Sequence, residues 1–442
     1  MEVMIKIAQL ILSLSILVVL HEFGHFAFAK IFKTRVEKFY LFFNPWFSLF
    51  KVKKGETEYG LGWLPLGGYV KISGMIDESM DKEAMKLPPK PYEFRSKPAW
   101  QRLFIMIGGV LVNFLLAIFI YILMLYINGE QYLPTKNVKY GIQCDSTALD
   151  IGLKNGDKIL SLDNNEIEDF SKIIQHILLD DIKSIQVDRD GERIEIPINE
   201  QVLAKLIKQE SYFILPRFPF EPFVIHGYTS DDSPAKLAGL QKGDSLKSIN
   251  GKVFTYYDEF QDYLQKFKGE EVGIGVKREN EYLEYAVTLT SEGMIGVSKE
   301  PYNPFEFEKI EYTFLASIPA GITKGYKTSV NYLKQFKLIF NPETEAYKSV
   351  GSFITIGNLF PGTWDWEFFW TITALLSIML GVLNLLPIPA LDGGHVMFLL
   401  YEIVAGRKPS DKFLEYAQIV GMVILLSLMV LAIGNDFIKH VF

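Results

Sequence analysis

Apolar residues along this chain of 442 residues are gathered into four blocks, separated by stretches of ordinary polar composition. Each block approaches the roughly 20 apolar residues that an α-helix needs to cross the hydrocarbon core of a membrane. The blocks cover residues 5–28, 103–127, 368–387 and 417–433, and the last of them is short. Residues 128–316, between the second and third blocks, have the composition of a soluble domain. This pattern predicts a polytopic α-helical membrane protein with four transmembrane helices and one large insertion outside the membrane.

Basic residues indicate how these blocks cross the membrane. Residues 31–102 carry 13 Lys and Arg, and short loops rich in these residues stay in the cytoplasm. We therefore expect both termini and the insertion to lie on the outer side. The first block also contains Ala27-Phe28-Ala29, which resembles a signal-peptide cleavage site. However, the block is longer than an ordinary signal core and its positive charges follow it, so we interpret it as a retained helix.

The insertion contains an internal repeat. The stretch STALDIGLKNGDKILSLDN, which begins at Ser146, aligns without a gap with SPAKLAGLQKGDSLKSING, which begins at Ser233. Each copy predicts a short helix, a turn that ends in Gly-Asp, and a strand with alternating apolar residues. The shared pattern is similar to PDZ domains of bacterial proteases, and two copies of an unrelated small β-rich domain are the alternative. A PDZ fold implies a groove in which a peptide adds as a strand, so peptide ligands could bind there.

The charge of the insertion limits the kinds of partner that it can bind, and the cysteine content of the chain excludes an internal disulfide. Residues 128–316 hold 21 basic and 33 acidic residues, which gives a net charge of −12. Such an acidic balance argues against nucleic acid as a partner. The single cysteine of the chain, Cys144, excludes an internal disulfide.

The first block ends in the sequence HEFGH, residues 21–25, which places ionisable side chains in an apolar segment. On a helix, His21 and His25 lie on one face, one turn apart, so that two imidazoles can hold one Zn²⁺ ion. Glu22 is then close enough to a metal-bound water to remove its proton. The alternative, two interfacial histidines that extend from a helix end toward the membrane surface, leaves the glutamate unexplained. The motif therefore predicts a zinc site with Glu22 as its catalytic base.

A catalytic zinc site needs a third protein ligand and an open fourth position. The stretch NLLPIPALDGGH, residues 384–395, is the best source, because its prolines end a helix and its paired glycines allow a sharp turn. Asp392 lies in this break, and a carboxylate at membrane depth needs a partner such as a metal ion. His395 is the rival ligand, and a plain turn with a surface aspartate is the simplest alternative. Chemistry favours Asp392 without excluding His395.

Four motifs together resemble those of the site-2 proteases, a family of intramembrane zinc metalloproteases. HEFGH and NLLPIPALDGGH match the two metal-binding motifs of that family. LPLGGYVKISGM, residues 64–75, matches its re-entrant β-loop, and GGVLVNF, residues 108–114, matches the motif of its second helix. Val110 departs from the family, which commonly has Pro at this position. The resemblance runs along nearly the whole chain.

The resemblance implies both the third ligand and the reaction. In site-2 proteases the aspartate of this motif is a ligand, which implies that Zn²⁺ is held by His21, His25 and Asp392. The implied activity is that of an endopeptidase with Glu22 as general base, which cuts transmembrane segments of other proteins in regulated intramembrane proteolysis. The implied substrates are single-span membrane proteins such as an anti-sigma factor, whose cleavage releases a stress response, and remnant signal peptides. The PDZ-like domains would exclude substrates whose outer domain has not been trimmed.

The same resemblance implies a location. A protein of this kind lies in the cell inner membrane as a multi-pass protein. Its PDZ-like domains and both termini are then periplasmic. His21 lies about 16 residues into the first block, roughly 24 Å along a helix at the standard rise, so the active site should lie toward the cytoplasmic side.

The segment YGLGWLPLGGYVKI, residues 59–72, is the candidate for pairing with the substrate. It alternates short strand-like pieces with Gly and Pro, and it can dip into the membrane only if protein covers its backbone. A tight hairpin packed on the membrane face is the alternative. An extended substrate could pair with the edge of this loop. The four edge residues are Tyr69, Val70, Lys71 and Ile72.

Asn113 and Asn384 are single amides inside apolar blocks. Such residues usually join helices by hydrogen bonds, and we interpret both in this way. By resemblance, Asn384 also lies close to the substrate backbone.

The remaining segments complete the expected domain organisation. Residues 314–340 carry several lysines among apolar residues, which predicts an amphipathic helix along the outer surface and not a fifth span. The expected parts are an N-terminal membrane part (1–127), two PDZ-like domains (128–215 and 216–300), an amphipathic juxtamembrane segment (301–365) and a C-terminal membrane part (366–442).

Two other functions fit parts of the pattern. A non-catalytic membrane scaffold could display two PDZ domains and use zinc only to join helices, but a structural zinc site needs no base such as Glu22. A metal transporter could use intramembrane His and Asp as its pathway, but transporters usually show more symmetry among their helices.

Overall fold

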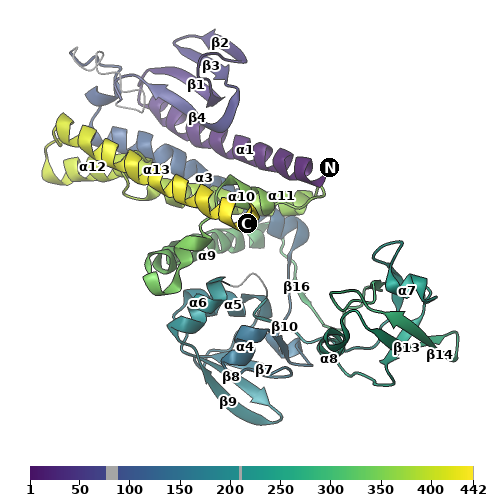
Figure 1. The fold of residues 1–442 in the computed structure, drawn as a ribbon. Helices are drawn as coiled ribbons and strands as arrows, with labels where there is room; N and C mark the ends of the chain where they lie inside the picture. The colour runs from purple at the N-terminus through teal and green to yellow at the C-terminus, as the bar shows by residue number, and fades with distance from the viewer. Residues whose placement is uncertain (76–87, 209–211, 442) are drawn as a thin grey trace. The chain divides into compact units, whose positions relative to one another are not determined.

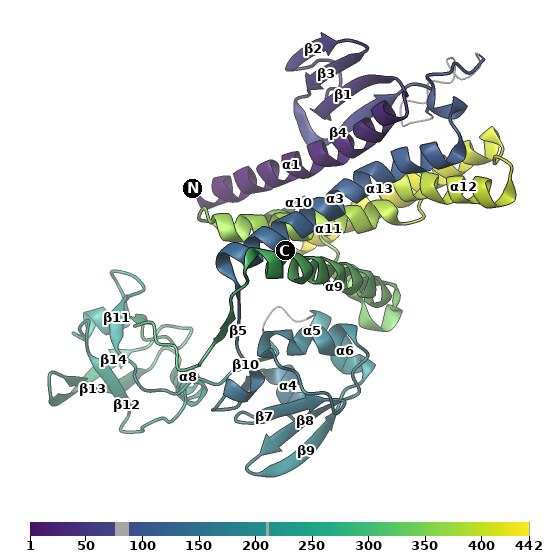
Figure 2. The ribbon, with the colours of Figure 1, turned by 180° about the vertical axis from the view of Figure 1, so that it is seen from behind.

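The computed structural model describes residues 1–75, 88–208 and 212–441. Contacts between residues divide the chain into two compact units, shown in Figures 1 and 2. One unit combines Met1–Glu130 with Ile310–Phe442, and the other is Gln131–Lys309. The insertion predicted from composition therefore forms a unit of its own.

Within the described residues, four helices are long and apolar enough to cross a membrane. They are α1 (Glu2–Ile31), α3 (Ala99–Asn128), α11 (Trp366–Leu385) and α13 (Asp411–Val441). The four predicted blocks thus coincide with four helices. The fourth helix is much longer than the predicted block, because its polar end remains helical. There the carboxylate of Asp436 accepts hydrogen bonds from the backbone and side chains of Ser352 and Thr355.

Helices α1 and α3 cross closely at a pair of glycines. A Cβ atom on Gly24 would lie 2.2 Å from the carbonyl oxygen of Gly108, and a Cβ on Gly108 would lie 2.6 Å from the carbonyl oxygen of Gly24. Any larger residue at either position would push the helices apart. Small residues are how helices approach each other in membranes, where the hydrophobic effect does not drive their association. This crossing brings the C-terminal half of α1, with its HEFGH motif, against α3.

A four-stranded sheet follows α1 in the chain. Its strands are β1 (Val36–Phe43), β2 (Phe50–Lys54), β3 (Thr57–Leu61) and β4 (Leu64–Ile72), in the order β2-β3-β1-β4. Strand β4 runs antiparallel to β1, with Tyr69 opposite Tyr40, and their rings stack with centroids 5.3 Å apart. Among the described residues, β4 has a sheet neighbour only on its β1 side, so it is an edge strand of this sheet, and it packs against α1. A Cβ on Gly68 of β4 would lie 2.7 Å from Val18 of α1.

The described residues of this unit form three further α-helices. They are α9 (Phe314–Phe340), α10 (Phe353–Asn358) and α12 (Asp392–Ala405). Helix α9 has the predicted limits, and it is not among the four helices that meet the length and hydropathy criteria for a membrane span. It packs on α3 through small residues, since a Cβ on Gly321 would lie 2.5 Å from Ile122.

The second unit contains two copies of one element order. The first copy consists of α4 (Ser146–Asp150), β7 (Lys158–Leu162), α5 (Ile173–Leu179), β8 (Ser184–Arg189) and β9 (Glu192–Pro197). The second consists of α7 (Pro234–Leu237), β12 (Ser245–Ile249), α8 (Tyr257–Leu264), β13 (Glu271–Arg278) and β14 (Glu281–Thr288). Both three-stranded sheets are antiparallel. The short strands β6 (Ile142–Cys144), β10 (Ile214–Pro216), β11 (Ile225–Tyr228) and β15 (Val297–Lys299) form two further pairs.

Aligned aspartates of the two copies make equivalent hydrogen bonds to an arginine. The carboxylate of Asp157, from the first Gly-Asp motif, accepts hydrogen bonds from Arg189 at 2.7 and 2.8 Å. Asp244, at the aligned position, accepts them from Arg278 at 2.6 and 2.8 Å. Burial alone would raise the pKa of Asp244, but these hydrogen bonds and one from the backbone of Gln241 hold it below the usual value. The conserved geometry shows that the repeat in the sequence is also a repeat in structure.

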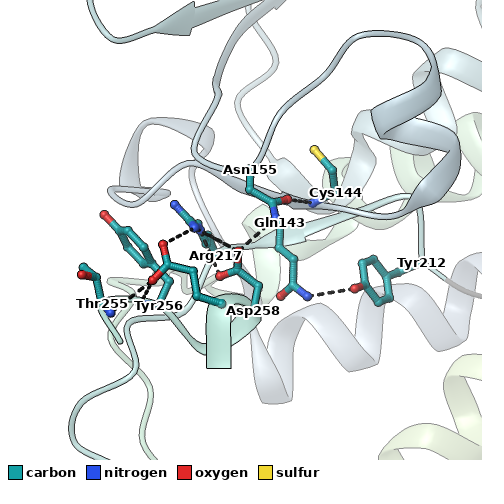
Figure 3. Close-up of polar contacts among 9 residues, drawn as sticks. Gln143, Cys144, Asn155, Tyr212, Arg217, Thr255, Tyr256 and Asp258 are labelled. Carbon is teal, nitrogen blue, oxygen red and sulfur yellow. Dashed lines mark hydrogen bonds and ion pairs between the residues drawn. The ribbon is translucent and has the colours of Figure 1, made fainter. Parts of the chain in front are cut away.

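Arg217 lies in the chain between the first copy and the second, and Figure 3 shows its polar contacts. Its guanidinium donates to the buried carboxylate of Asp258 at 2.9 and 3.0 Å and lies 3.7 Å from the ring centroid of Tyr256. Asn155, from the first copy, donates to the same carboxylate at 3.0 Å. Since removing one partner of a buried ion pair leaves an uncompensated charge, neither copy can be deleted alone without disturbing the other.

Candidate metal centre

Two histidines of α1 and one aspartate of α12 converge on a single point. Nε2 of His21 and Nε2 of His25 lie 3.2 Å apart. Oδ2 of Asp392 lies 3.2 Å from each of them, so the three atoms form an equilateral triangle. The ligands of a tetrahedral zinc ion, at about 2.0–2.1 Å from the metal, stand about 3.3 Å apart. Within the described ranges, these residues form the one group of three or more His, Cys, Asp or Glu side chains placed to hold a metal ion.

Hydrogen bonding shows that this triangle suits a cation. Nδ1 of His25 lies 2.8 Å from the carbonyl oxygen of Ile105, and since a carbonyl only accepts, Nδ1 carries the proton. In the neutral imidazole, Nε2 of His25 then carries no hydrogen and presents a lone pair. Oδ2 of Asp392 is buried without a hydrogen-bond partner among the described residues. Two electron-rich atoms held 3.2 Å apart repel each other unless a cation lies between them, and two imidazoles with one carboxylate are a ligand set that zinc accepts.

The loop before α12 places Asp392. Helix α11 ends at Leu385, ahead of the predicted Pro break, and α12 begins at Asp392 itself. A Cβ on Gly393 would lie 2.1 Å from the carbonyl oxygen of Leu386, so the close approach of α12 to the preceding loop requires glycine there. The long helix α13 supports the loop from outside, since a Cβ on Gly421 would lie 1.5 Å from the carbonyl oxygen of Pro389. The prolines follow the end of α11 as the sequence predicts. The paired glycines do not make the expected sharp turn, because both lie in the first turn of α12 without a positive φ, and the positive φ of this loop is at Ala390.

Helix α3 leaves room for the imidazoles. A Cβ on Gly109 would lie 2.4 Å from Nε2 of His25 and 2.7 Å from Cε1 of His21. One helical turn further on, Asn113 lies with its amide nitrogen 3.1 Å from Nδ1 of His21. We interpreted Asn113 from the sequence only as a link between helices. The signal that could have found it is the spacing of four residues from Gly109, which puts both residues on the face of α3 that meets the histidines.

A cavity of about 500 Å³ opens at the metal triangle. Glu22 lines it together with the two histidines and Asp392. The edge strand β4 forms another part of the wall, and all four residues predicted to pair with substrate line the cavity: Tyr69, Val70, Lys71 and Ile72. Glu22, the metal triangle and the edge strand β4 therefore line the same cavity.

Two other predicted residues lie elsewhere. Asn384 is half-buried near the end of α11 and does not line this cavity. His395 lines a separate cavity of about 130 Å³, together with the ion pair of Arg102 and Glu402. The structure thus brings Asp392, and not His395, to the two histidines. Asn384 as a substrate contact remains a prediction.

Comparison with known proteins identifies the class of this site. The family described as Peptidase family M50 matches residues 9–428. The chain therefore belongs to peptidase family M50, the site-2 protease family. The prediction of the family is confirmed. The predictions of a zinc cofactor and of metalloprotease activity in regulated intramembrane proteolysis are also confirmed, and the scaffold alternative is not favoured. With its four apolar helices, the chain is an inner-membrane protein.

Individual relatives extend over the full length of the chain. A protein of Haemophilus influenzae named Regulator of sigma E protease is 29% identical, over 98% of this chain and 99% of the relative. A protein of Yersinia pestis named Protease RseP is 28% identical, over 99% of both chains. A solved structure of the PDZ domain of an SdrC-like protein from Listeria monocytogenes is 27% identical and covers 18% of this chain and 87% of the other, with a TM-score of 0.16.

Proposed function

We propose that His21, His25 and Asp392 hold the catalytic zinc ion and that Glu22 is the general base. The observation that carries this proposal is the equilateral triangle of 3.2 Å between the three ligand atoms. Glu22 lines the cavity that opens from this triangle. Three protein ligands would leave the fourth coordination position of the zinc ion for water or substrate, as a catalytic zinc site requires.

The chemistry is divided between metal and protein. When bound, zinc acts as a Lewis acid that polarises a carbonyl and makes water easier to deprotonate. Glu22 removes a proton from the attacking water and then delivers it to the amine that leaves the scissile peptide bond. The fixed hydrogen bond from His25 to Ile105 holds one imidazole in the orientation that this requires.

The substrate is proposed to bind as an extended strand along β4. A helical peptide uses its carbonyl groups in its own hydrogen bonds, so it must unwind before water can attack one of them. Residues 68–72 of β4 line the cavity, and β4 is an edge strand of its sheet. The unwound segment would add to this edge as a further strand, which would stabilise it. Strands β1 to β4 are proposed to reach into the membrane from the cytoplasmic side as a re-entrant element.

The unit Gln131–Lys309 is proposed to be a tandem of two PDZ-like domains that filters substrates. This rests on the repeated element order and on the equivalent pairs of Asp157 with Arg189 and Asp244 with Arg278. We place this unit and both termini in the periplasm because of the basic residues at 31–102. Relatives named for regulation of sigma E support an anti-sigma factor as substrate. Remnant signal peptides are proposed as a second class of substrate. The PDZ-like grooves could also bind peptide ligands.

Removing zinc should abolish cleavage and returning it should restore cleavage. The purified protein in detergent is incubated with a model single-span substrate, and products are followed on gels. A chelator should stop cleavage, and about one equivalent of Zn²⁺ should restore it, because the site holds one ion. Mg²⁺ is the control, since it prefers six oxygen ligands and does not suit this triangle. Full cleavage by metal-stripped protein would refute a zinc mechanism.

Removing the second unit should relax substrate choice and spare the metal site. Strands β5 (Glu130–Tyr132) and β16 (Glu308–Ile310) pair with each other, so a short Gly/Ser linker can join Tyr132 to Glu308. The deletion removes both repeats together, so the buried carboxylate of Asp258 is not left without its partners. The variant should bind zinc normally, and its preference for trimmed over untrimmed substrate should fall from at least about tenfold to near one. A deletion variant that folds and discriminates as before would show that these domains are not the filter.

A further inference from the structure

Asn113 has a buried side-chain amide whose nitrogen has a hydrogen-bond partner and whose oxygen has none among the described residues. The residue is 0% exposed on α3. Its Nδ2 lies 3.1 Å from Nδ1 of His21, whereas its Oδ1 is buried without a hydrogen-bond partner among the described residues. A buried acceptor left without a donor is destabilising, so this arrangement calls for an explanation.

The metal triangle decides which end of the amide must face His21. An imidazole binds a metal through the nitrogen that carries no hydrogen, and Nε2 of His21 is the atom at the triangle. Nδ1 then carries the hydrogen and is a donor. The NH₂ group of an amide is also a donor, and two donors 3.1 Å apart make no hydrogen bond. A half-turn of the amide exchanges its two ends and brings the acceptor Oδ1 to Nδ1.

We propose that Asn113 is a positioning residue that accepts a hydrogen bond from Nδ1–H of His21 through Oδ1, and so fixes the tautomer that binds the metal. This inference rests on the proposed function of His21 as a ligand. Helix α3 then provides a hydrogen-bond acceptor for each imidazole, because the carbonyl of Ile105 accepts a hydrogen bond from Nδ1 of His25 at 2.8 Å. One acceptor is backbone and the other is a side chain, so only Asn113 can be tested by substitution.

The competing explanation is that Asn113 only joins α1 to α3. A buried polar contact between membrane helices contributes to their association whatever the metal does. The chain offers a matched example in Ser13 of α1, whose hydroxyl lies 3.0 Å from that of Thr373 on α11, with both residues fully buried. Ser13→Ala removes a contact of the same kind that does not touch an imidazole, and it is the control.

Two substitutions of Asn113 separate the roles. Asn113→Asp keeps an acceptor and removes the donor, whereas Asn113→Leu removes both. Outer hydrogen bonds to metal-binding histidines typically change metal affinity by about 10- to 100-fold. We expect Asn113→Leu to raise the dissociation constant for Zn²⁺ by about this factor, and Asn113→Asp and Ser13→Ala to leave it equal to or below the wild-type value.

The measurement is competition for Zn²⁺ against a chromophoric chelator, on the full-length protein in one detergent, with thermal unfolding as a check of the fold. Unchanged affinity in Asn113→Leu would overturn the proposal. So would an equal loss in Asn113→Asp, because that result would show that the amide acts as a donor. If Asn113→Leu does not fold, the comparison of Asn113→Asp with wild type still decides between acceptor and donor. His21→Ala is measured alongside and tests whether His21 is a metal ligand. A failure of the proposed function can then be distinguished from a failure of the proposal for Asn113.

Discussion

Glu22→Gln should retain about one zinc ion per chain and cut a transmembrane substrate at least about a hundredfold more slowly than wild type. Glutamine is nearly isosteric with glutamate, so helix packing and both imidazoles should be undisturbed. It cannot take a proton from water, and general-base assistance typically contributes 10²- to 10⁴-fold in rate. Glu22 lines the cavity but is not part of the metal triangle, so metal binding and catalysis should separate at this residue.

Zinc is measured by mass spectrometry and cleavage by gel, in the same detergent preparation. Glu367→Gln is the matched control, because this glutamate is exposed in the first turn of α11. It should cleave at the wild-type rate. Wild-type cleavage by a fully metallated Glu22→Gln protein would rule out the proposed base.

The metal site was largely predictable because its parts are short local motifs. His21 and His25 lie one helical turn apart, which sequence spacing alone establishes. Asp392 is different, since it is far along the chain, and chemistry only favoured it over His395 until the resemblance settled the choice. Nothing in the sequence states that α12 begins at Asp392 or that its carboxylate lies 3.2 Å from both imidazoles. That distance depends on tertiary packing.

The sheet after α1 was predicted only in part. The pieces that became β3 and β4 contain Gly and Pro, which mark short strands. Strand β1 reads VEKFYLFF, an apolar run with little alternation, and no pattern distinguished it from its surroundings. Its partner is decided by tertiary contacts such as the stacking of Tyr40 on Tyr69. The edge position of β4, on which the substrate proposal depends, was therefore an expectation that needed the structure.

The repeats show the same division between local and long-range information. The aligned Gly-Asp motifs were visible because they match without a gap. Their arginine partners were not, because Arg189 follows Asp157 by 32 residues and Arg278 follows Asp244 by 34. A difference of two residues between the copies hides the equivalence from an ungapped alignment. Asn113 was missed for a related reason, since a sequence does not show what a buried amide faces.

Asp392→Ala should lose zinc affinity and cleavage together, while His395→Ala should keep both. Removing Asp392 leaves only two imidazoles on the metal, and we expect the dissociation constant for Zn²⁺ to rise by at least about a hundredfold, more than for loss of an outer hydrogen bond. His395 lines the separate cavity beside Arg102 and Glu402. Its loss should therefore leave the triangle intact.

The two alanine variants control for each other, because both residues lie in the first turn of α12. A general loosening of that helix would weaken zinc binding in both variants, whereas loss of a ligand weakens it in one. Affinity is measured by chelator competition, and cleavage with the same model substrate that tests Glu22. Full zinc occupancy and full activity in Asp392→Ala, with loss of both in His395→Ala, would show that the third ligand is the histidine. The carboxylate that lies 3.2 Å from both imidazoles would then need another partner.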